Sequence, residues 1–405
     1  MSPEVATVVH ERAPALTRPS RPPRATAVSN RIPVLDGIRG VAILLVLLFH
    51  FSVYGGGLAV SGAAIDRAYY RLAGAGWMGV DLFFVLSGFL ITGILYDAKG
   101  SAHYFRNFYA RRVLRIFPLY YFALLIFTVV LPIALPEHRG LQMIERDAPW
   151  YWTYLSNVSI ARDGWPQYGA IGHFWSLAVE EQFYLLWPLV VLRFGRRPLQ
   201  ALCVTCIVGA LIVRTVASAS GEVTAAFVLT PARLDALAIG AYVALAQRSP
   251  GGLAGLRGRA RSAALWLGGA IVGLSVWRRG FAAYDPVVSS VGLSVLAGFF
   301  GALLILALTA RSNAVVARFL GARWLRFFGQ YSYALYVVHH PILFFMPGLT
   351  WLSFVPTILG SVLLRQAAFL VIATGVSIVV ALVSWHLIEK HFLELKGRFA
   401  LRGVA

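Results

Sequence analysis

The amino-acid sequence predicts an all-α integral membrane protein with about ten transmembrane helices and both termini in the cytoplasm. Hydrophobic residues make up 59% of the 405 residues and charged residues 13%, which is about half the charged share of soluble domains. Apolar segments close to the ~20 residues that span a bilayer recur along the chain. Lys and Arg gather in short clusters between these segments, as is typical of cytoplasmic loops.

The predicted helices follow one another with mostly short connections. Their expected positions, with boundary errors of about 2–4 residues, are 38–54, 77–96, 117–135, 173–194, 198–216, 231–247, 262–277, 287–309, 329–346 and 366–388. Residues 101–116 mix aromatics with arginines, which predicts a helix lying at the cytoplasmic interface. Residues 136–172 form the longest outer loop. Its Trp and Tyr residues suit either the aromatic belt of the membrane or a cover over an opening.

The two ends of the chain differ from its apolar middle. Residues 1–30 are rich in Pro, Arg, Ser, Thr and Ala without an apolar stretch of signal-peptide length, which predicts a disordered cytoplasmic tail. Residues 31–392 form the predicted transmembrane domain, and residues 393–405 form a cytoplasmic C-terminal tail. With the N-terminus inside, 26 of the 36 Lys and Arg residues fall on the cytoplasmic side. This bias predicts a multi-pass protein of the cell (inner, cytoplasmic) membrane.

The composition also excludes other classes of protein. The net charge of +19 is compatible with nucleic-acid binding, but no basic domain stands apart from the membrane segments. We therefore expect the lipid bilayer as a partner and no nucleic acid. Cys203 and Cys206 lie in an apolar run without a neighbouring His or Cys, which favours packing. His50 has no carboxylate three or four residues further on and the chain has no HExxH motif, so no metal is expected.

Ionisable residues inside predicted membrane helices are costly and therefore suggest function. Arg39 and His50 are 11 residues apart. A helix brings them to one face, about 16 Å apart along its axis. The pair places a cation near the cytoplasmic edge and a titratable base deep in the bilayer. The alternative is a snorkelling arginine with a buried, hydrogen-bonded histidine.

Two further helices carry polar residues whose depth the sequence leaves open. Asp81 and Ser87 are the polar interruptions of helix 77–96, and Asp81 is solvated if it lies at the outer rim. Arg233 and Asp235 lie near the start of another helix, where an ion pair at the outer rim is the simplest interpretation.

Adjacent carboxylates occur in an apolar frame in the segment HFWSLAVEEQFYLLWP. They are Glu180 and Glu181, and Gln182 follows them. Successive side chains of a helix point about 100° apart, so both cannot face lipid cheaply. At least one of the two carboxylates should therefore face a polar cavity.

Arginine and histidine pairs complete the set of candidates. Arg112 and Arg115 share a helix face and suit phosphate, although simple anchoring at the cytoplasmic side explains them equally well. In YSYALYVVHHP, Tyr336 lies three residues before His339 and four before His340, so one helix face can present them together.

Seven stretches of this chain, in this order, resemble the acyltransferase family 3 of membrane proteins. They are LDGIRGVAILLVLLFH, GWMGVDLFFVLSGFLIT, FYARRVLRIFPLYY, FWSLAVEEQFYLLWPL, ARLDALAIGA, YSYALYVVHHP and SWHLIEKHF. Single pieces are weak signals, but the ordered set over residues 32–392 is specific.

The resemblance implies an O-acyltransferase that moves an acyl group, often acetyl, from acetyl-CoA or another acyl-CoA to a hydroxyl group. The acceptors of such proteins include surface polysaccharides, lipids and macrolide-like compounds. The family's motifs fall on Arg39 with His50, on Arg112 with Arg115, on Glu180, Glu181 and Gln182, and on His339. His340 stands where the family usually has an apolar or aromatic residue, so which of the two histidines acts stays open.

A hypothetical mechanism assigns roles to these residues. His50 acts as the general base, because an imidazole titrates near neutral pH. The donor's phosphates contact the arginines, Glu180 or Glu181 orients His50 or the acceptor hydroxyl, and Tyr333, Tyr336 or His339 donates to the oxyanion. The other polar candidates, for substrate binding or structure, are Asp36, Asp81, Ser87, Gln182, Arg233 and Asp235. Direct transfer and a covalent acyl-histidine are both compatible with the sequence.

Two other functions are alternatives to acyl transfer. A proton-coupled transporter would use buried His, Glu and Arg as a relay, but the two halves of the chain show no pseudo-repeat. A non-catalytic scaffold would not need polar residues converging from several helices. The sequence does not identify the acceptor, the acyl chain or the oligomeric state.

Overall fold

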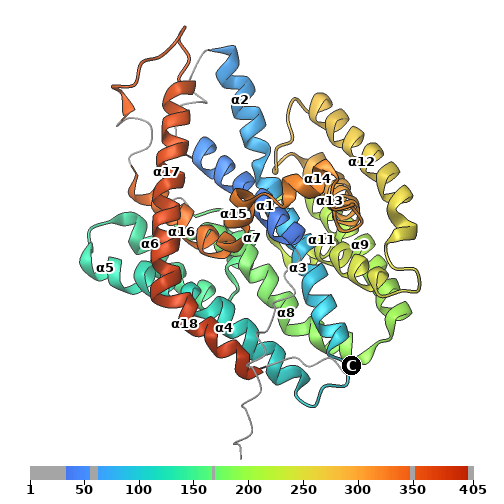
Figure 1. The fold of residues 1–405 in the computed structure, drawn as a ribbon. Coiled ribbons are helices and arrows are strands. Elements are labelled where there is room, and N and C mark those ends of the chain that lie inside the picture. Colours follow the sequence, from blue (N-terminus) through green and yellow to red (C-terminus); the bar gives the residue numbers. More distant parts are fainter. Residues whose placement is uncertain (1–32, 55–62, 167–168, 347–351, 400–405) are drawn as a thin grey trace, which may run out of the picture. The chain divides into compact units, whose positions relative to one another are not determined.

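The computed structural model describes residues 33–54, 63–166, 169–346 and 352–399. The predicted tail 1–30 lies outside these residues. The described chain is helical throughout, apart from turns, loops and one isolated antiparallel bridge between Ile358 and Ser361 (Figure 1). The prediction of an all-α protein is therefore confirmed.

The helices of the described residues range in length from 4 residues (α5) to 24 residues (α9). In chain order they are α1 (Pro33–Val53), α2 (Ala64–Gly74), α3 (Met78–Asp97), α4 (Tyr104–Leu125), α5 (Leu131–Ala134), α6 (Arg139–Trp152), α7 (Ser156–Asp163), α8 (Trp175–Arg193), α9 (Arg196–Ala219), α10 (Val223–Val228), α11 (Thr230–Gln247), α12 (Arg257–Trp277), α13 (Leu293–Leu308), α14 (Val315–Leu320), α15 (Arg323–Gln330), α16 (Ser332–Phe345), α17 (Leu363–Ser384) and α18 (Lys390–Glu394). Short 3-10 or π turns link or extend several of them, including η9 (Leu395–Phe399) after α18.

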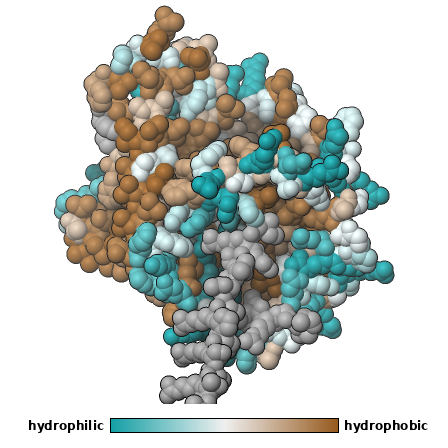
Figure 2. Space-filling view, in the orientation of Figure 1, coloured by the Kyte–Doolittle hydropathy of each residue, from teal (hydrophilic) through white to brown (hydrophobic). Residues whose placement is uncertain are grey.

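Eight helical segments of the described chain are long and apolar enough to cross a membrane, judged by length and composition. They are Pro33–Val53, Ala64–Asp97, Tyr104–Ala134, Arg196–Ala219, Val223–Gln247, Ala254–Trp277, Val288–Leu308 and Leu363–Phe399. Hydrophobic side chains cover the face along which α17 runs, where Val371 and Val379 are exposed (Figure 2). Such a surface is stable against lipid rather than water, so the chain is a multi-pass membrane protein.

Two predicted spans differ from these eight. Helix α8 carries both Glu180 and Glu181, and α16 has only 14 residues. Both segments are helical, as the sequence predicts, but they are not among the eight that meet the length and composition of a span. The figure of about ten crossings, and the cytoplasmic placement of both termini, stay predictions.

The structure also joins segments that the sequence analysis separates. The predicted interfacial helix 101–116 and span 117–135 form one run, because α4 continues through a π turn into α5. Pro118 lies inside α4 without ending it. The predicted outer loop 136–172 contains α6 and α7, and the unpredicted helix α2 leads through a 3-10 turn into α3.

Glycines let α3 and α11 cross at close range. A Cβ added to Gly88 would lie 1.9 Å from the carbonyl oxygen of Leu237, and one added to Gly240 would lie 1.9 Å from that of Val85. No side chain fits at either position, so small residues set the distance between the two helices. This approach brings polar groups of α3 and α11 into direct contact.

Candidate active site

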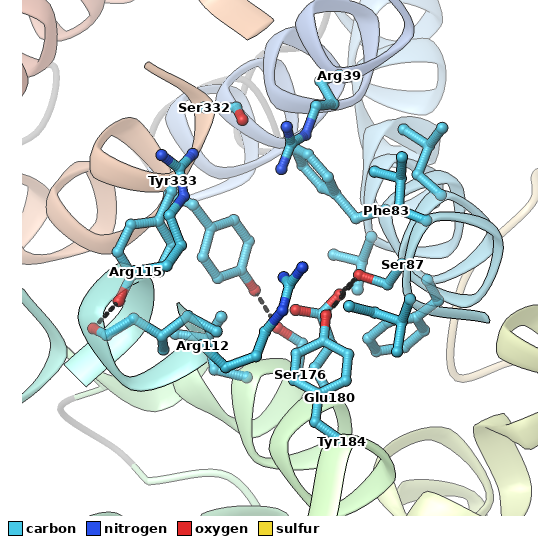
Figure 3. A pocket seen from close by; sticks show the side chains of 18 residues that line it. Arg39, Phe83, Ser87, Arg112, Arg115, Ser176, Glu180, Tyr184, Ser332 and Tyr333 are labelled. Atoms are coloured by element: carbon cyan, nitrogen blue, oxygen red, sulfur yellow. Dashed lines mark hydrogen bonds between the residues drawn. The ribbon is translucent and has the colours of Figure 1, made fainter. Parts of the chain in front are cut away.

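One cavity lies between α1, α3, α4, α8 and α16 and has an empty volume of about 800 Å³. We call it the arginine cavity, because arginines from α1 and α4 extend into it (Figure 3). Its polar lining residues are Arg39, Ser87, Arg112, Arg115, Ser176, Glu180, Tyr184, Ser332, Tyr333 and Tyr336. Folding thus gathers candidates that lie far apart in the sequence, and adds Ser176 and Tyr184.

The three arginines of this cavity are not neutralised by ion pairs. None of the ion pairs between described residues includes Arg39, Arg112 or Arg115. Arg112 instead lies over the ring of Tyr184, 5.6 Å from its centroid. The carboxylate that interacts most strongly with Arg39 is Asp36, one turn earlier on α1 and outside the cavity lining. Half-buried cations around an empty space favour an anionic ligand.

The adjacent carboxylates point in different directions, as helix geometry requires. Glu180 lines the arginine cavity and accepts a hydrogen bond from Ser87, whose hydroxyl also lies 2.8 Å from the Tyr184 hydroxyl. Glu181 does not line the cavity, and its buried Oε1 has no hydrogen-bond partner among the described residues. Glu180 is therefore the carboxylate that faces the polar cavity.

Gln182 belongs to the scaffold rather than to either cavity. Its Nε2 donates to the carbonyl of Tyr154 at 2.8 Å and to Oδ1 of Asn157 at 2.9 Å. Its Oε1 accepts from the hydroxyl of Thr230. These bonds tie α8 to the segment around α7 and to the start of α11, which fixes the rotation of α8 and hence the direction of Glu180.

The second cavity lies on the other side of a thin wall and has an empty volume of about 830 Å³. We call it the histidine cavity. It is lined by Phe49, His50, Tyr54, Trp77, Val80, Trp165, Pro166, Gly169, Gly172, His173, Trp175, Phe227, Ala283, Tyr284, Tyr336 and His340. Among the described residues, the lining contains aromatic rings and histidines but no Lys, Arg, Asp or Glu.

Four histidine rings meet beside this cavity. The centroid of His50 lies 4.8 Å from that of His339 and 4.9 Å from that of His340. The ring of His173 lies 4.9 Å from His339 and 5.1 Å from His340. No group of three or more His, Cys, Asp or Glu in the described part of the chain has an arrangement that could hold a metal ion. Imidazoles titrate near neutral pH, so a cluster of histidines suits proton transfer.

Hydrogen bonds orient the histidines differently. Nδ1 of His50 lies 2.9 Å from the carbonyl of Val46, so this nitrogen carries the proton in the neutral ring and Nε2 keeps its lone pair. His339 is fully buried, does not line the cavity, and its Nε2 has no partner among the described residues. His340 lines the cavity, with Nδ1 3.3 Å from the carbonyl of Ala170. Of the two adjacent histidines, His340 thus faces the open space.

Tyr336 and Val80 line both cavities and form the wall between them. The Tyr336 hydroxyl donates to the carbonyl of His173 at 3.0 Å and lies 2.5 Å from the hydroxyl of Ser176. Arg39 and His50 therefore share α1 but open into different cavities, rather than along one continuous path. Tyr333 is also engaged, because its hydroxyl donates to the carbonyl of Ile116 at 2.6 Å.

The structure excludes a solvated position for Asp81, and Arg233 and Asp235 do not pair with each other. Asp81 and Arg233 form a buried ion pair at 2.6 Å between α3 and α11. Asp235 pairs instead with Arg214 of α9 at 2.7 Å, and this guanidinium also donates to the hydroxyl of Ser294 at 2.5 Å. The glycine-mediated approach of α3 and α11 places these groups in the interior, where an unpaired charge is costly.

Two of these residues were missed, although the sequence carries a signal for each. Arg214 stands alone in the apolar run CIVGALIVRTVA, where a single guanidinium requires a buried partner. His173 is the first residue of the predicted span 173–194, but only 3% of it is exposed and it belongs to the histidine cluster. The local sequence HFWSL, in which His173 lies two residues before Trp175, does not predict that His173 lies next to α16.

The chain is similar to known proteins over most of its length. Residues 32–386 match a family model described as an acyltransferase domain. The putative peptidoglycan O-acetyltransferase YrhL of Bacillus subtilis (strain 168) is 28% identical over 330 residues, which cover 77% of this chain and 48% of YrhL. The O-acetyltransferase OatA of Staphylococcus aureus (strain NCTC 8325 / PS 47) is 28% identical over 342 residues, which cover 78% of this chain and 51% of OatA.

A third relative is the peptidoglycan O-acetyltransferase OatA of Listeria monocytogenes, serovar 1/2a. It is 31% identical over 187 residues, which cover 43% of this chain and 27% of that protein. This chain therefore spans about half the length of the first two relatives. No solved structure matches it.

Proposed function

This chain belongs to the acyltransferase family 3, and on that premise we propose that it transfers an acyl group, in the first place acetyl, from acyl-CoA to a hydroxyl group of a carbohydrate. The observation that carries the proposal is a pair of cavities with one shared wall. One cavity presents arginines that form no ion pair with a described residue, and the other presents a histidine base among aromatic rings. Group transfer between an anionic donor and an uncharged acceptor needs such a pair of sites.

The arginine cavity is the proposed donor site. Acyl-CoA would supply an activated acyl group as a thioester, together with phosphates that a guanidinium binds well. Arg39, Arg112 and Arg115 fit this group, since no ion pair between described residues occupies them. We place this cavity toward the cytoplasm, because the Lys and Arg clusters of the chain, including Arg111 to Arg115, are expected on that side.

The histidine cavity is the proposed acceptor site. Its aromatic lining offers apolar faces together with hydroxyl and indole N–H groups, and no Lys, Arg, Asp or Glu of the described chain lines it. An uncharged, hydroxyl-bearing ring system fits this chemistry. The names of the relatives YrhL and of the Listeria OatA, which refer to peptidoglycan, support a carbohydrate acceptor.

His50 is the proposed general base. Its Nδ1 is bonded to the Val46 carbonyl, so the lone pair on Nε2 is available for the proton of the acceptor hydroxyl. His340 lines the same cavity 4.9 Å from the His50 ring, and it is placed to share the proton. Tyr336, whose hydroxyl contacts that of Ser176, belongs to the wall through which the acyl group has to pass. A hydroxyl released from this wall would be a donor to the oxyanion.

A transporter gains no support from the arrangement of the buried charges. Asp81, Arg233, Asp235 and Arg214 are paired with one another and line neither cavity. They are accounted for by packing between α3, α9 and α11, which removes them from any relay along the cavities.

The proposal is tested with the purified chain in liposomes that contain labelled acetyl-CoA and soluble peptidoglycan fragments. Release of free CoA thiol and label in the glycan are measured for the wild type, for His50→Gln, and for His386→Gln as an exposed-histidine control. We expect His50→Gln to lower transfer by about 10²–10⁴-fold, the usual size of general-base catalysis. The control should match the wild type.

Each other outcome rejects a defined part of the proposal. Equal transfer by the wild type and a folded His50→Gln protein would remove His50 as the base. Thiol release without label in the glycan would reject the carbohydrate acceptor. A wild-type protein that does not bind CoA would reject the donor site.

A further inference from the structure

The C-terminal segment of the described chain packs against the helix that carries the cavity arginines. Helix α18 and the following 3-10 turn η9 lie along α4 (Figure 1). Arg111 fixes this contact, because its guanidinium lies 3.4 Å from the carbonyl of Lys396 and 3.3 Å from that of Phe399. The backbone of Lys396 is thereby held beside Arg111, the residue that precedes Arg112 on α4.

The side chain of Lys396 lies in a strongly positive environment. It interacts electrostatically with Arg39 and with the α4 arginines, including Arg112 and Arg115. It is half-buried, and no hydrogen bond or ion pair with a described residue holds its ammonium group. A flexible lysine packed beside several arginines is unfavourable unless a bound anion lies among them.

The nearby carboxylates do not balance these cations. The cations are Arg39, Arg111, Arg112, Arg115 and Lys396, and the carboxylates that interact with them are Asp36, Glu180, Glu181 and Glu389. Glu389 is buried and accepts a hydrogen bond from Ser384 at 3.2 Å. The positive excess therefore extends beyond the lining of the arginine cavity, toward η9.

We propose that Lys396 forms a second phosphate subsite, which binds a phosphate monoester of the donor separately from the phosphates held by the cavity arginines. The inference rests on the proposed function, since coenzyme A carries both a diphosphate and a 3′-phosphate monoester on its ribose. Arg39, Arg112 and Arg115 hold the diphosphate, and Lys396 binds the monoester from outside the cavity lining. A compact ammonium group suits a monoester that carries close to two negative charges near neutral pH.

The subsite predicts discrimination between two forms of the same nucleotide. The wild type should bind CoA about tenfold more tightly than 3′-dephospho-CoA, the effect of one charge-assisted contact. Lys396→Met keeps the aliphatic stem and removes the charge. It should weaken CoA binding by the same factor and leave the affinity for 3′-dephospho-CoA within about twofold of the wild type.

The experiment is calorimetric titration of both nucleotides into the purified full chain in detergent. Lys390→Met is the matched control, because Lys390 lies in the same segment and is exposed. Lys396→Arg should keep the preference for CoA, since it keeps the charge. Lys396→Gln repeats the test with a polar side chain if methionine changes the thermal unfolding of the protein.

The outcomes separate this inference from the proposed function. If the wild type binds CoA but Lys396→Met leaves the ratio of the two affinities unchanged, Lys396 is not the monoester subsite. Equal weakening of both nucleotides, or the same effect in Lys390→Met, would show a general effect of charge and also overturn the inference. If the wild type binds neither nucleotide, the donor site and the subsite fall together.

Discussion

Two regions of this protein bury arginine side chains in opposite ways. Between α3, α9 and α11, Arg214 and Arg233 are 0% and 1% exposed, and each contacts one aspartate. Between α1, α4 and α8, Arg39, Arg112 and Arg115 face a cavity, and the ion pairs between described residues do not include them. Charges that hold helices together are paired within the protein. Charges that bind a ligand have no such partner, because the ligand supplies the opposite charge.

The same contrast applies to the histidines. His50 and His340 line a cavity, whereas His339 of α16 is fully buried, with its ring centroid 4.8 Å from that of His50 on α1. A sequence motif does not distinguish a side chain that lines a cavity from one that supports the cavity wall. Mutagenesis can test whether this distinction separates functional from structural residues.

The largest expected effect is on the paired region. Asp235→Ala leaves the guanidinium of Arg214 buried without its carboxylate, and should lower the free energy of unfolding by about 3 kcal/mol. The measurement is thermal or denaturant unfolding of the purified protein in detergent. Asp163→Ala is the control, because the Arg162–Asp163 pair is 61% and 48% exposed, and it should leave stability unchanged. A small effect of Asp235→Ala on stability would mean that ion pairing does not distinguish structural charges from ligand-binding charges in this protein.

An intermediate effect is expected in the arginine cavity, and on binding rather than stability. Arg112→Gln should weaken CoA binding by about 10–100-fold, because one charge-assisted contact with a phosphate is lost. Its unfolding should match the wild type, since no ion pair between described residues is broken. Arg106→Gln, an exposed position two turns earlier on α4, is the control for binding. Loss of stability without loss of CoA affinity would make Arg112 a structural residue.

The smallest effect is expected for His340. His340→Gln should lower the transfer rate roughly tenfold, the size of one lost polar contact, with CoA affinity unchanged. Steady-state rates at saturating acetyl-CoA provide the measurement. His339→Gln should instead lower the unfolding temperature, because its side chain is fully buried. If His339→Gln abolished transfer in a stable protein while His340→Gln had no effect, the assignment by cavity lining would be wrong.

Much of the site could be identified from single segments of the sequence. Arg39 and His50 are polar residues in one apolar helix, and Glu180 with Glu181 had to place one carboxylate in a cavity. These inferences depend on helical periodicity, which is local, and the structure brings Arg39, Arg112, Arg115 and Glu180 to one cavity.

Contacts between residues on different helices could not be predicted in the same way. Asp81 lies 152 residues from Arg233, and nothing in either segment indicates that they meet. Their contact depends on the close crossing of α3 and α11 at Gly88 and Gly240. The interpretation of Asp81 as a solvated residue depended on the local sequence, which does not indicate that α3 and α11 cross closely.

The sequence by itself determined the all-α membrane architecture and the residue types that carry the chemistry, because composition and helical period act over a few turns of chain. Only the tertiary structure decided which charges pair, which carboxylate faces the cavity, and that Tyr336 divides the site into two cavities. The physical reason is that crossing points and helix rotations are set by packing between segments distant in sequence. The position of Lys396 beside the cavity arginines depends on that same packing.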